Sequence, residues 1–336
     1  MVVTAMPGSR SGCRRDECSA SNLDRAPEGR PSPKRRRTVR ENDYAGFLAA
    51  AGHRVVHLEG VDWYAYQGFM MPAYLPHATP EISRDHARRL QSLARCPFVR
   101  WSEGFTTAAE GPWWYVIRRG PYSLQQCSAN TRSKIRRGMK RLTVRRATLD
   151  EMREQGHSVC IRAAERYDGV GVATVPRPEE FADRLGAAAT YPGVVEYYAV
   201  FRGDRMVAFA ENHLQAQAAF WENIWYDPEA LRDYSSYALT HVMLEDYLNR
   251  RGYRYVTDGS RSLYHQTRVQ QFFIDNFGFT LQYARLQVVY GPAFGCLVNT
   301  AYGLRRWLLP AIVPRIPAVQ KAKAILAQET IRRSCR

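Results

Sequence analysis

An acid, a glycine and an arginine stand between a short apolar strand and an apolar helix. The predicted strand is "YRYVTD", and Asp258, Gly259, Ser260 and Arg261 begin at its carboxyl end. Ligands in open sheets bind just beyond such strand ends. A crevice at that place needs charge and little bulk. We therefore expect Asp258 to act in catalysis and Ser260 and Arg261 to bind substrate.

Two neighbouring side chains suit recognition and proton transfer. Arg261 can bind an acceptor carboxylate through paired hydrogen bonds, or it can pair with Asp258. His265 carries an imidazole that titrates near neutral pH. It is either a proton carrier beside the substrate or a surface histidine at the start of a helix.

Two glutamates lie on adjacent strands that are rich in apolar residues. Glu222 stands in "AAFWENIWY" and Glu211 in "MVAFAENHL". Apolar surroundings raise the pKa of a carboxylate, which suits general-base work. The alternative is a pair of solvent-facing strand residues. Tyr226 ends the strand of Glu222, and we expect it to contact the substrate.

The elements around these residues follow a regular order. The sequence predicts strands over "VVEYYAVF", "MVAFAENHL" and "AAFWENIWY", and the four-residue link RGDR between the first two indicates a hairpin. A helix follows from Ser235 or Ser236 to about Gly252, with an apolar stripe that we assign to the core. The last strand is predicted from 279 to 290, with a bulge near Ala284 where its apolar phase slips.

The net charge of +16 is concentrated in the tails. Residues 1–40 hold ten Lys or Arg and four acids, residues 301–336 hold eight and one, and residues 41–300 carry about +3. Within that body, Arg132 to Arg146 contains eight basic residues and no acid. This run is either a docking site for an anionic partner or a solvated helix face.

The cysteines and the apolar runs exclude several classes of protein. Seven scattered cysteines without a C-x-x-C pair indicate neither a disulfide framework nor a zinc site, so we expect a cytoplasmic protein and no metal. No apolar stretch reaches the length of a membrane-spanning helix. A P-loop NTPase is excluded because the sequence lacks G-x-x-x-x-G-K-S/T.

The order of three antiparallel strands, a helix, a strand, a helix and a strand opening on "FGF" resembles the GNAT acyltransferase superfamily. The stretches "IWYDPEALRDYSSYALTHVML", "FFIDNFGF" and "SANTRSKIRRGMKR" are similar to the Fem-type and BioF-like subgroup. The resemblance implies an α/β (α+β) fold, with a mixed, mostly antiparallel sheet flanked by helices. It implies attack by an amine on an activated acyl carbon, with Glu222, Glu211 or Asp258 as the base.

The resemblance also implies a division of the chain. We expect a disordered basic tail (1–40), a degenerate GNAT-like half (41–150), a GNAT-like acyltransferase domain (151–292) and a basic amphipathic helical arm (293–336). The arm resembles a helix of the membrane surface, and packing of the arm on the body is the alternative.

The phosphate-binding loop departs from the superfamily pattern. Arg232 is retained, whereas Ser235, Ser236 and Tyr237 stand where small residues let backbone N–H groups approach a pyrophosphate. Thr267 takes the position of an asparagine that often faces the cofactor. We expect Arg232, Ser235, Ser236 and Thr267 to bind the cofactor.

Three functions are compatible with these residues. The first is an N-acyltransferase that moves an acyl group from acyl-CoA to an amine. The second is a Fem-type transferase that takes the acyl group from aminoacyl-tRNA, held by the Arg132–Arg146 run, and forms an amide on a peptide, amino acid or natural-product amine. The third is a non-catalytic GNAT-like protein that binds nucleic acid or a membrane surface through its tails.

Overall fold

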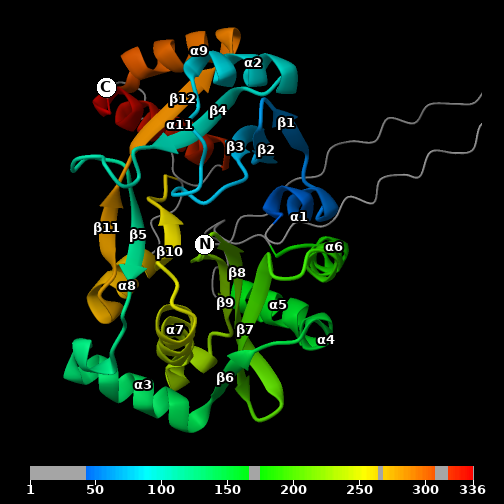
Figure 1. The fold of residues 1–336 in the computed structure, drawn as a ribbon, viewed down its shortest axis with the longest axis vertical. Coiled ribbons are helices and arrows are strands. Elements are labelled where there is room, and N and C mark those ends of the chain that lie inside the picture. The colour runs from blue at the N-terminus through cyan, green and yellow to red at the C-terminus, as the bar shows by residue number, and fades with distance from the viewer. Residues whose placement is uncertain (1–42, 166–174, 264–267, 307–316, 336) are drawn as a thin grey trace, which may run out of the picture.

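The computed structural model describes residues 43–165, 175–263, 268–306 and 317–335. Its strands form two sheets, one above the other in Figure 1, and helices flank both. The predicted disordered tail and the apolar run 307–314 of the arm lie outside the described residues. The predicted α/β (α+β) class, with mostly antiparallel sheets flanked by helices, is confirmed.

The first sheet has five strands in the order β1-β2-β3-β4-β12. These are β1 (Val55–Leu58), β2 (Val61–Tyr66), β3 (Phe69–Pro72), β4 (Phe98–Glu103) and β12 (Arg285–Tyr290). Helix α2 (Arg84–Ala94) packs against it and starts at Ser83, whose hydroxyl accepts from the backbone N–H of His86. All strand pairs are antiparallel except β3 with β4.

The second sheet has seven strands in the order β11-β5-β10-β9-β8-β7-β6. These are β11 (Thr280–Tyr283), β5 (Trp114–Arg119), β10 (Tyr255–Ser260), β9 (Ala218–Tyr226), β8 (Arg205–Gln215), β7 (Val195–Arg202) and β6 (Thr143–Arg146). The predicted hairpin is confirmed, because Arg202 pairs with Arg205 and Gly203 takes a positive φ of 59° in the turn. The parallel pair in this sheet is β9 with β10.

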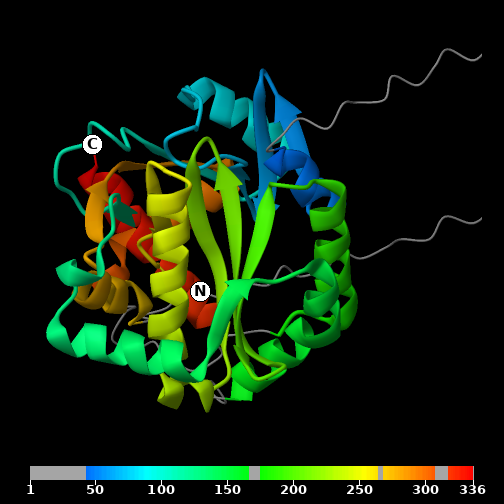
Figure 2. The same cartoon turned by 60° about the horizontal axis from the view of Figure 1, so that its bottom comes forward.

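Helices cover both faces of the second sheet (Figure 2). One face packs on α3 (Ala129–Arg141), α7 (Ser235–Leu244) and α8 (Val269–Phe277), and the other on α1 (Tyr44–Ala50), α5 (His157–Glu165) and α6 (Pro178–Thr190). The apolar stripe predicted for α7 is core, since Leu239, Met243 and Tyr247 are fully buried. A short α4 (Leu149–Glu151) leads into π-helix η2 (Met152–Gly156), and π-helix η4 (Glu245–Arg250) extends α7 to the turn at Gly252.

The strand predicted from 279 to 290 does not exist as one element. Its two parts are β11 and β12, which belong to different sheets and are separated at Ala284. The predicted bulge was therefore wrong. The phase slip near Ala284 marks the residue where the chain leaves one sheet and enters the other, because each part turns a different set of side chains to its own core.

The two sheets do not divide the chain at single positions. Strands β5 and β6 come from the segment predicted as the N-terminal half, 41–150, yet they are strands of the seven-stranded sheet. Strand β12 lies in the segment 151–292, yet it belongs to the five-stranded sheet. The predicted domain boundaries remain a prediction, and they do not coincide with the division of the strands between the two sheets.

The described part of the C-terminal arm packs on the body. Helices α9 (Pro292–Gly303) and α11 (Pro317–Ser334) contact each other, and α11 contacts β12. Leu326 and Ile331 are buried there, and Arg332 and Arg333 both pair with the buried Glu329, at 2.6 Å. No helix among the described residues is long and apolar enough to cross a membrane.

Candidate active site

Strands β9 and β10 separate in the middle of the seven-stranded sheet. They pair in parallel from Ala218 with Tyr255 to Phe220 with Thr257, and the pairing ends there. Beyond this point the two strands run on to Tyr226 and Ser260. We call the stretch over which β9 and β10 are no longer paired the opening in the sheet, and polar residues of both strands lie along it.

Glu222 and Asp258 each lie at an irregularity of the sheet next to this opening. On β9 the pairing with β8 shifts so that Glu222 is skipped between Trp221 and Asn223. On β10 the pairing with β5 shifts between Thr257 and Gly259, which leaves Asp258 without a partner residue. Bulges of this kind redirect side chains and are frequent next to active sites.

Glu211 and Glu222 are brought together by one arginine of α6. The Arg184 guanidinium donates to Glu211 Oε1, and its Nη2 lies 2.9 Å from Glu222 Oε2. Asn223 Nδ2 also donates to Glu211 at 3.3 Å, and the Tyr44 hydroxyl donates to Glu222 at 3.2 Å. We call Arg184, Glu211 and Glu222 the carboxylate cluster.

The charge of the carboxylate cluster is not balanced when both glutamates are ionised. Burial raises the pKa of Glu211, against the attraction of Arg184, and Glu222 raises it further. Burial likewise raises the pKa of Tyr44 well above its ordinary value, so this hydroxyl is a neutral donor. Within the cluster one arginine pairs with two carboxylates, which leaves a net charge of −1 when both are ionised. The cluster is therefore suited to accept one proton.

A neutral histidine supports Tyr44 from β8. The His213 ring stacks on the Tyr44 ring with centroids 3.4 Å apart. Burial lowers the pKa of His213 to about 3, so the ring is uncharged at neutral pH. Tyr44 is thereby held between a flat neutral ring and the Glu222 carboxylate.

Asp258 lies outside the ion pairs of the described residues. It is 3% exposed, Gln270 at the start of α8 donates to it, and burial raises its pKa to about 7. Gly259, next to it, has φ of +90°, and a Cβ there would lie 3.0 Å from the Phe220 ring. The position requires glycine for both reasons, which accounts for the glycine between Asp258 and Arg261.

The predicted phosphate-binding residues surround the start of α7. Arg232 is exposed in the 3-10 helix η3 (Ala230–Asp233), Ser236 is half-buried, and Ser235 is fully buried with no partner for its hydroxyl among the described residues. Tyr234 precedes the helix with a positive φ of 62°. This is the left-handed conformation that small residues adopt most readily.

Helix α3 packs across this start of α7. A Cβ on Gly138 would lie 2.9 Å from the Tyr234 carbonyl oxygen and 3.1 Å from the Ala238 Cβ. Arg141 pairs with Asp233 at 3.0 Å, and Lys134 Nζ donates to the Tyr237 hydroxyl at 3.1 Å. The N-terminus of α7 is therefore covered by the basic helix, and a pyrophosphate cannot reach Ser235 without moving α3.

The predicted substrate residues are partly brought together. Ser260 and Arg261 both line a cavity between the two sheets, whereas half-buried Tyr226 lies at the far end of β9. The Arg261 guanidinium donates to the Pro112 carbonyl at 2.9 Å. The described residues show no ion pair between Arg261 and Asp258, so that alternative is not formed. His265 and Thr267 lie outside the described residues.

Sequence reasoning missed three side chains of these sites, namely Arg184, Tyr44 and Arg100, the last of which lines the same cavity as Ser260 and Arg261. A signal existed for Arg184: the stripe of Phe181, Leu185 and Ala188 faces the core, and Arg184 interrupts it on the same side. A charged residue inside an apolar stripe indicates a buried partner of opposite charge. For Tyr44 and Arg100 the sequence carries no comparable signal.

Comparison with known proteins identifies one matching domain family. Residues 129–259 match the family model of the acetyltransferase (GNAT) domain. The match includes α3, α6 with Arg184, strands β8 and β9 with Glu211 and Glu222, and Asp258 of β10. No curated protein matches the chain.

Solved structures are similar to between a third and four fifths of the chain. The C-terminal domain of a putative lysylphosphatidylglycerol synthetase from Agrobacterium fabrum aligns with a TM-score of 0.50 and 11% identity, covering 79% of this chain and 92% of that one. FemX aligns with a TM-score of 0.47 and 11% identity, covering 71% and 88%. An N-acetyltransferase from Thermoplasma acidophilum in complex with coenzyme A aligns with a TM-score of 0.28 and 13% identity, covering 33% and 74%.

The family model and the shared fold agree with the resemblance seen in the sequence. Residues 129–259 match the acetyltransferase (GNAT) domain, and this match supports the superfamily resemblance.

Proposed function

We propose that this chain transfers an acyl group to an amine, with Glu222 as the general base. The observation that carries the proposal is the position of Glu222 at the bulge beside the opening between β9 and β10. Its side chain is 20% exposed, against 5% for Glu211, and Asp258 is 3% exposed. Glu222 is therefore the carboxylate that a substrate reaches most directly.

The charge of the carboxylate cluster favours this role. The acceptor enters as an ammonium ion and gives a proton to Glu222. The free amine then attacks the acyl carbonyl carbon and the new C–N bond forms. The C–O or C–S bond to the donor breaks, and the leaving oxygen or sulfur takes up the proton that the attacking nitrogen loses as it becomes an amide. After the first transfer, Arg184 and Glu211 balance each other, so proton uptake neutralises a site that is otherwise negative.

The donor that the geometry supports best is an aminoacyl-tRNA. The covered start of α7 argues against the usual grip on coenzyme A. The outer side of α3 presents the exposed Arg136, Arg137, Lys140 and Arg141. Clustered basic side chains supply most of the affinity for a polyanionic backbone.

Acyl-CoA is the second candidate donor. The match to an acetyltransferase (GNAT) domain favours it, and Arg232 is exposed beside the loop. A pyrophosphate bound by Arg232 alone, on the open side of η3, would not need access to Ser235. The two donors therefore use different surfaces of the same domain.

The test is amide formation with each donor. The protein is incubated with a peptide amine and with radiolabelled acetyl-CoA or charged tRNA, at moderate salt to screen non-specific attraction. We expect transfer from charged tRNA, reduced at least tenfold in Arg136→Ala/Arg137→Ala and unchanged in the control Arg232→Ala. Transfer from acetyl-CoA that depends on Arg232 would overturn the donor assignment. No amide from either donor would support the non-catalytic alternative.

A further inference from the structure

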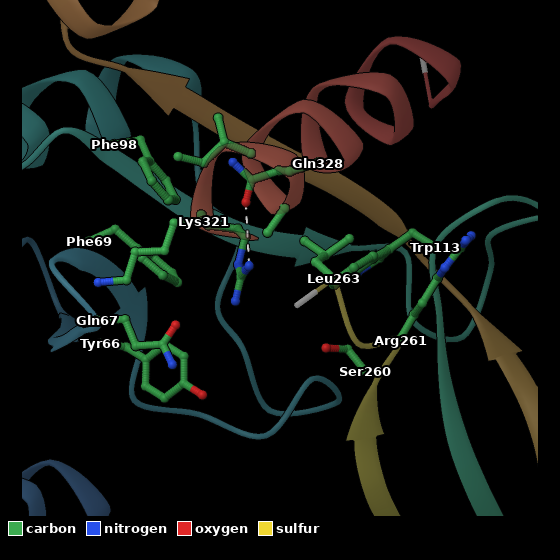
Figure 3. A pocket seen from close by; sticks show the side chains of 13 residues that line it. Tyr66, Gln67, Phe69, Phe98, Trp113, Ser260, Arg261, Leu263, Lys321 and Gln328 are labelled. Carbon is green, nitrogen blue, oxygen red and sulfur yellow. Dashed lines mark hydrogen bonds between the residues drawn. The ribbon is translucent and has the colours of Figure 1, made fainter. Parts of the chain in front are cut away.

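Arg100 of β4 projects into a cavity between the two sheets and α11. The cavity has a volume of about 150 Å³. Figure 3 shows Tyr66, Phe69 and Phe98 on one side of it and Leu263 and Trp113 on the other. None of the thirteen side chains that line it is an acid, although Lys321 and Arg261 add two more cations.

The Arg100 charge has no carboxylate partner among the described residues. Its guanidinium donates to Gln328 Oε1 at 3.3 Å and contacts the Met71 sulfur at 3.5 Å. It lies over the Phe69 ring, 4.5 Å from the centroid. Burial lowers the pKa of Arg100, and only tyrosine hydroxyls oppose this effect. An anion that binds beside a buried, unpaired cation of this kind stabilises it.

The size and the walls of the cavity limit what such an anion can be. An apolar cavity of about 150 Å³ holds a molecule the size of benzene. The aromatic and aliphatic walls favour an apolar group, and the planar guanidinium favours an oxyanion that accepts two hydrogen bonds. The ligand therefore combines an oxyanion with an apolar group no larger than about one ring.

A row of tyrosines connects this cavity with the carboxylate cluster. Tyr66 lines the cavity, its ring lies 6.2 Å from that of Tyr64, and the Tyr64 ring lies 6.3 Å from that of Tyr44, which donates to Glu222. Ser260, two residues after Asp258, lines the same cavity. The side chains of Tyr66, Tyr64 and Tyr44 thus lie between the cavity and Glu222.

We propose that this cavity binds the anionic end of the acceptor, a carboxylate or phosphate attached to a small apolar group, through Arg100. The acceptor then extends along the tyrosine row, and its amine reaches Glu222. The identification of the ligand as the acceptor rests on the proposed function, whereas the binding of an anion in the cavity does not. The substrate class is then an amine whose far end carries an oxyanion attached to a small apolar group.

The first test measures binding without turnover. Benzoate, phenyl phosphate, inorganic phosphate and benzyl alcohol are titrated into the full chain by calorimetry. We expect benzoate or phenyl phosphate to bind, and benzyl alcohol and inorganic phosphate to bind at least tenfold more weakly. The preferred oxyanion identifies the acceptor as a carboxylate or a phosphate. Arg100→Met is expected to weaken binding at least tenfold. The control Arg285→Met, an exposed arginine on neighbouring β12, is expected to leave it within threefold.

The second test uses the reaction. Gly-Gly-Phe and its C-terminal amide are compared as acceptors. An extended tripeptide separates its amine from its carboxylate by roughly 10 Å, which is on the scale of the tyrosine row, whose successive rings lie 6.2 and 6.3 Å apart. We expect a KM at least tenfold lower for the free acid, and no such difference in Arg100→Met. If benzoate binds but no acceptor is acylated, the cavity stands and the proposed function fails. If amides form while neither benzoate nor phenyl phosphate binds through Arg100, the inference is overturned and the function stands.

Discussion

Arg184 and Arg100 are two largely buried arginines that differ in what surrounds their charge. Arg184 contacts two carboxylates, and Arg100 contacts an amide oxygen, a sulfur and an aromatic ring. The first guanidinium is a fixed part of the fold, because it joins α6 to partners on β8 and β9. The second is a charge that the fold leaves uncompensated among its described residues. A compensated cation positions other groups, whereas an uncompensated one is available to a ligand.

The largest effect is expected from removing the compensated cation. Arg184→Met leaves the buried Glu211 and the half-buried Glu222 without their counter-ion, and breaking a buried pair costs about 3–5 kcal/mol. Urea denaturation at pH 7 measures the loss in unfolding free energy. The matched control is Arg177→Met, because Arg177, the N-cap residue of the same helix, is exposed and pairs with the half-buried Glu180, and pairs near the surface contribute about 0–1 kcal/mol. Equal losses in both variants would contradict the importance of the carboxylate cluster.

The next effect concerns Asp258, a buried carboxylate with no cation of its own among the described residues. Its pKa is raised to about 7 in the folded chain, against about 4 in an unfolded chain. The folded state therefore holds a proton that the unfolded state loses, so the unfolding free energy falls as pH rises from about 4 to about 7. The full difference is up to about 4 kcal/mol, at about 1.4 kcal/mol per unit.

Asp258→Asn keeps the uncharged shape at every pH. We expect this variant to match the wild type at pH 4 and to be more stable at pH 8, as measured by urea denaturation at both values. The difference between variant and wild type cancels the titration of all other groups. A difference that does not change with pH would show that Asp258 has an ordinary pKa.

A smaller effect separates the two partners of Arg184. Burial already raises the pKa of Glu211, so a neutral side chain is tolerated at this position. Glu211→Gln retains one carboxylate, Glu222, for the guanidinium, and we expect a loss of no more than about 1 kcal/mol. Thermal unfolding of this variant beside Arg184→Met makes the comparison. A loss as large as that of Arg184→Met would mean that both carboxylates must be ionised.

The smallest effect on stability is expected at the uncompensated cation. Arg100→Met removes a desolvated charge together with one cation–π contact, and we expect these contributions to cancel within about 1 kcal/mol. The measurement is urea denaturation in buffer without carboxylates or phosphate. A loss comparable with that of Arg184→Met would make Arg100 a structural residue and would remove the contrast between the two arginines.

The sequence predicts well those features that depend on local periodicity. The β7–β8 hairpin, the buried stripe of α7 and the neighbouring strands of Glu211 and Glu222 all follow from residue spacing. Proximity of two residues on paired strands is a consequence of register, so a sequence pattern can indicate it.

Features that depend on packing between distant segments were not predicted. The chain changes sheets at Ala284, and α3 covers the start of α7, because of contacts with elements more than 90 residues away. Tyr44 reaches Glu222 across 178 residues, and Arg100 meets Gln328 across 228. Spacing along the sequence carries no record of such contacts.

The measurement that tests the central claim most directly is the kcat of amide formation by Glu222→Gln, with the donor that the wild type accepts. We predict a kcat at least a hundredfold lower, since general-base catalysis contributes about 10²–10⁴-fold, with a KM for the donor within threefold of the wild type. The control Glu179→Gln, which removes an exposed carboxylate of α6, should retain full activity. A kcat in Glu222→Gln equal to that of the wild type would contradict the assignment of Glu222 as the base.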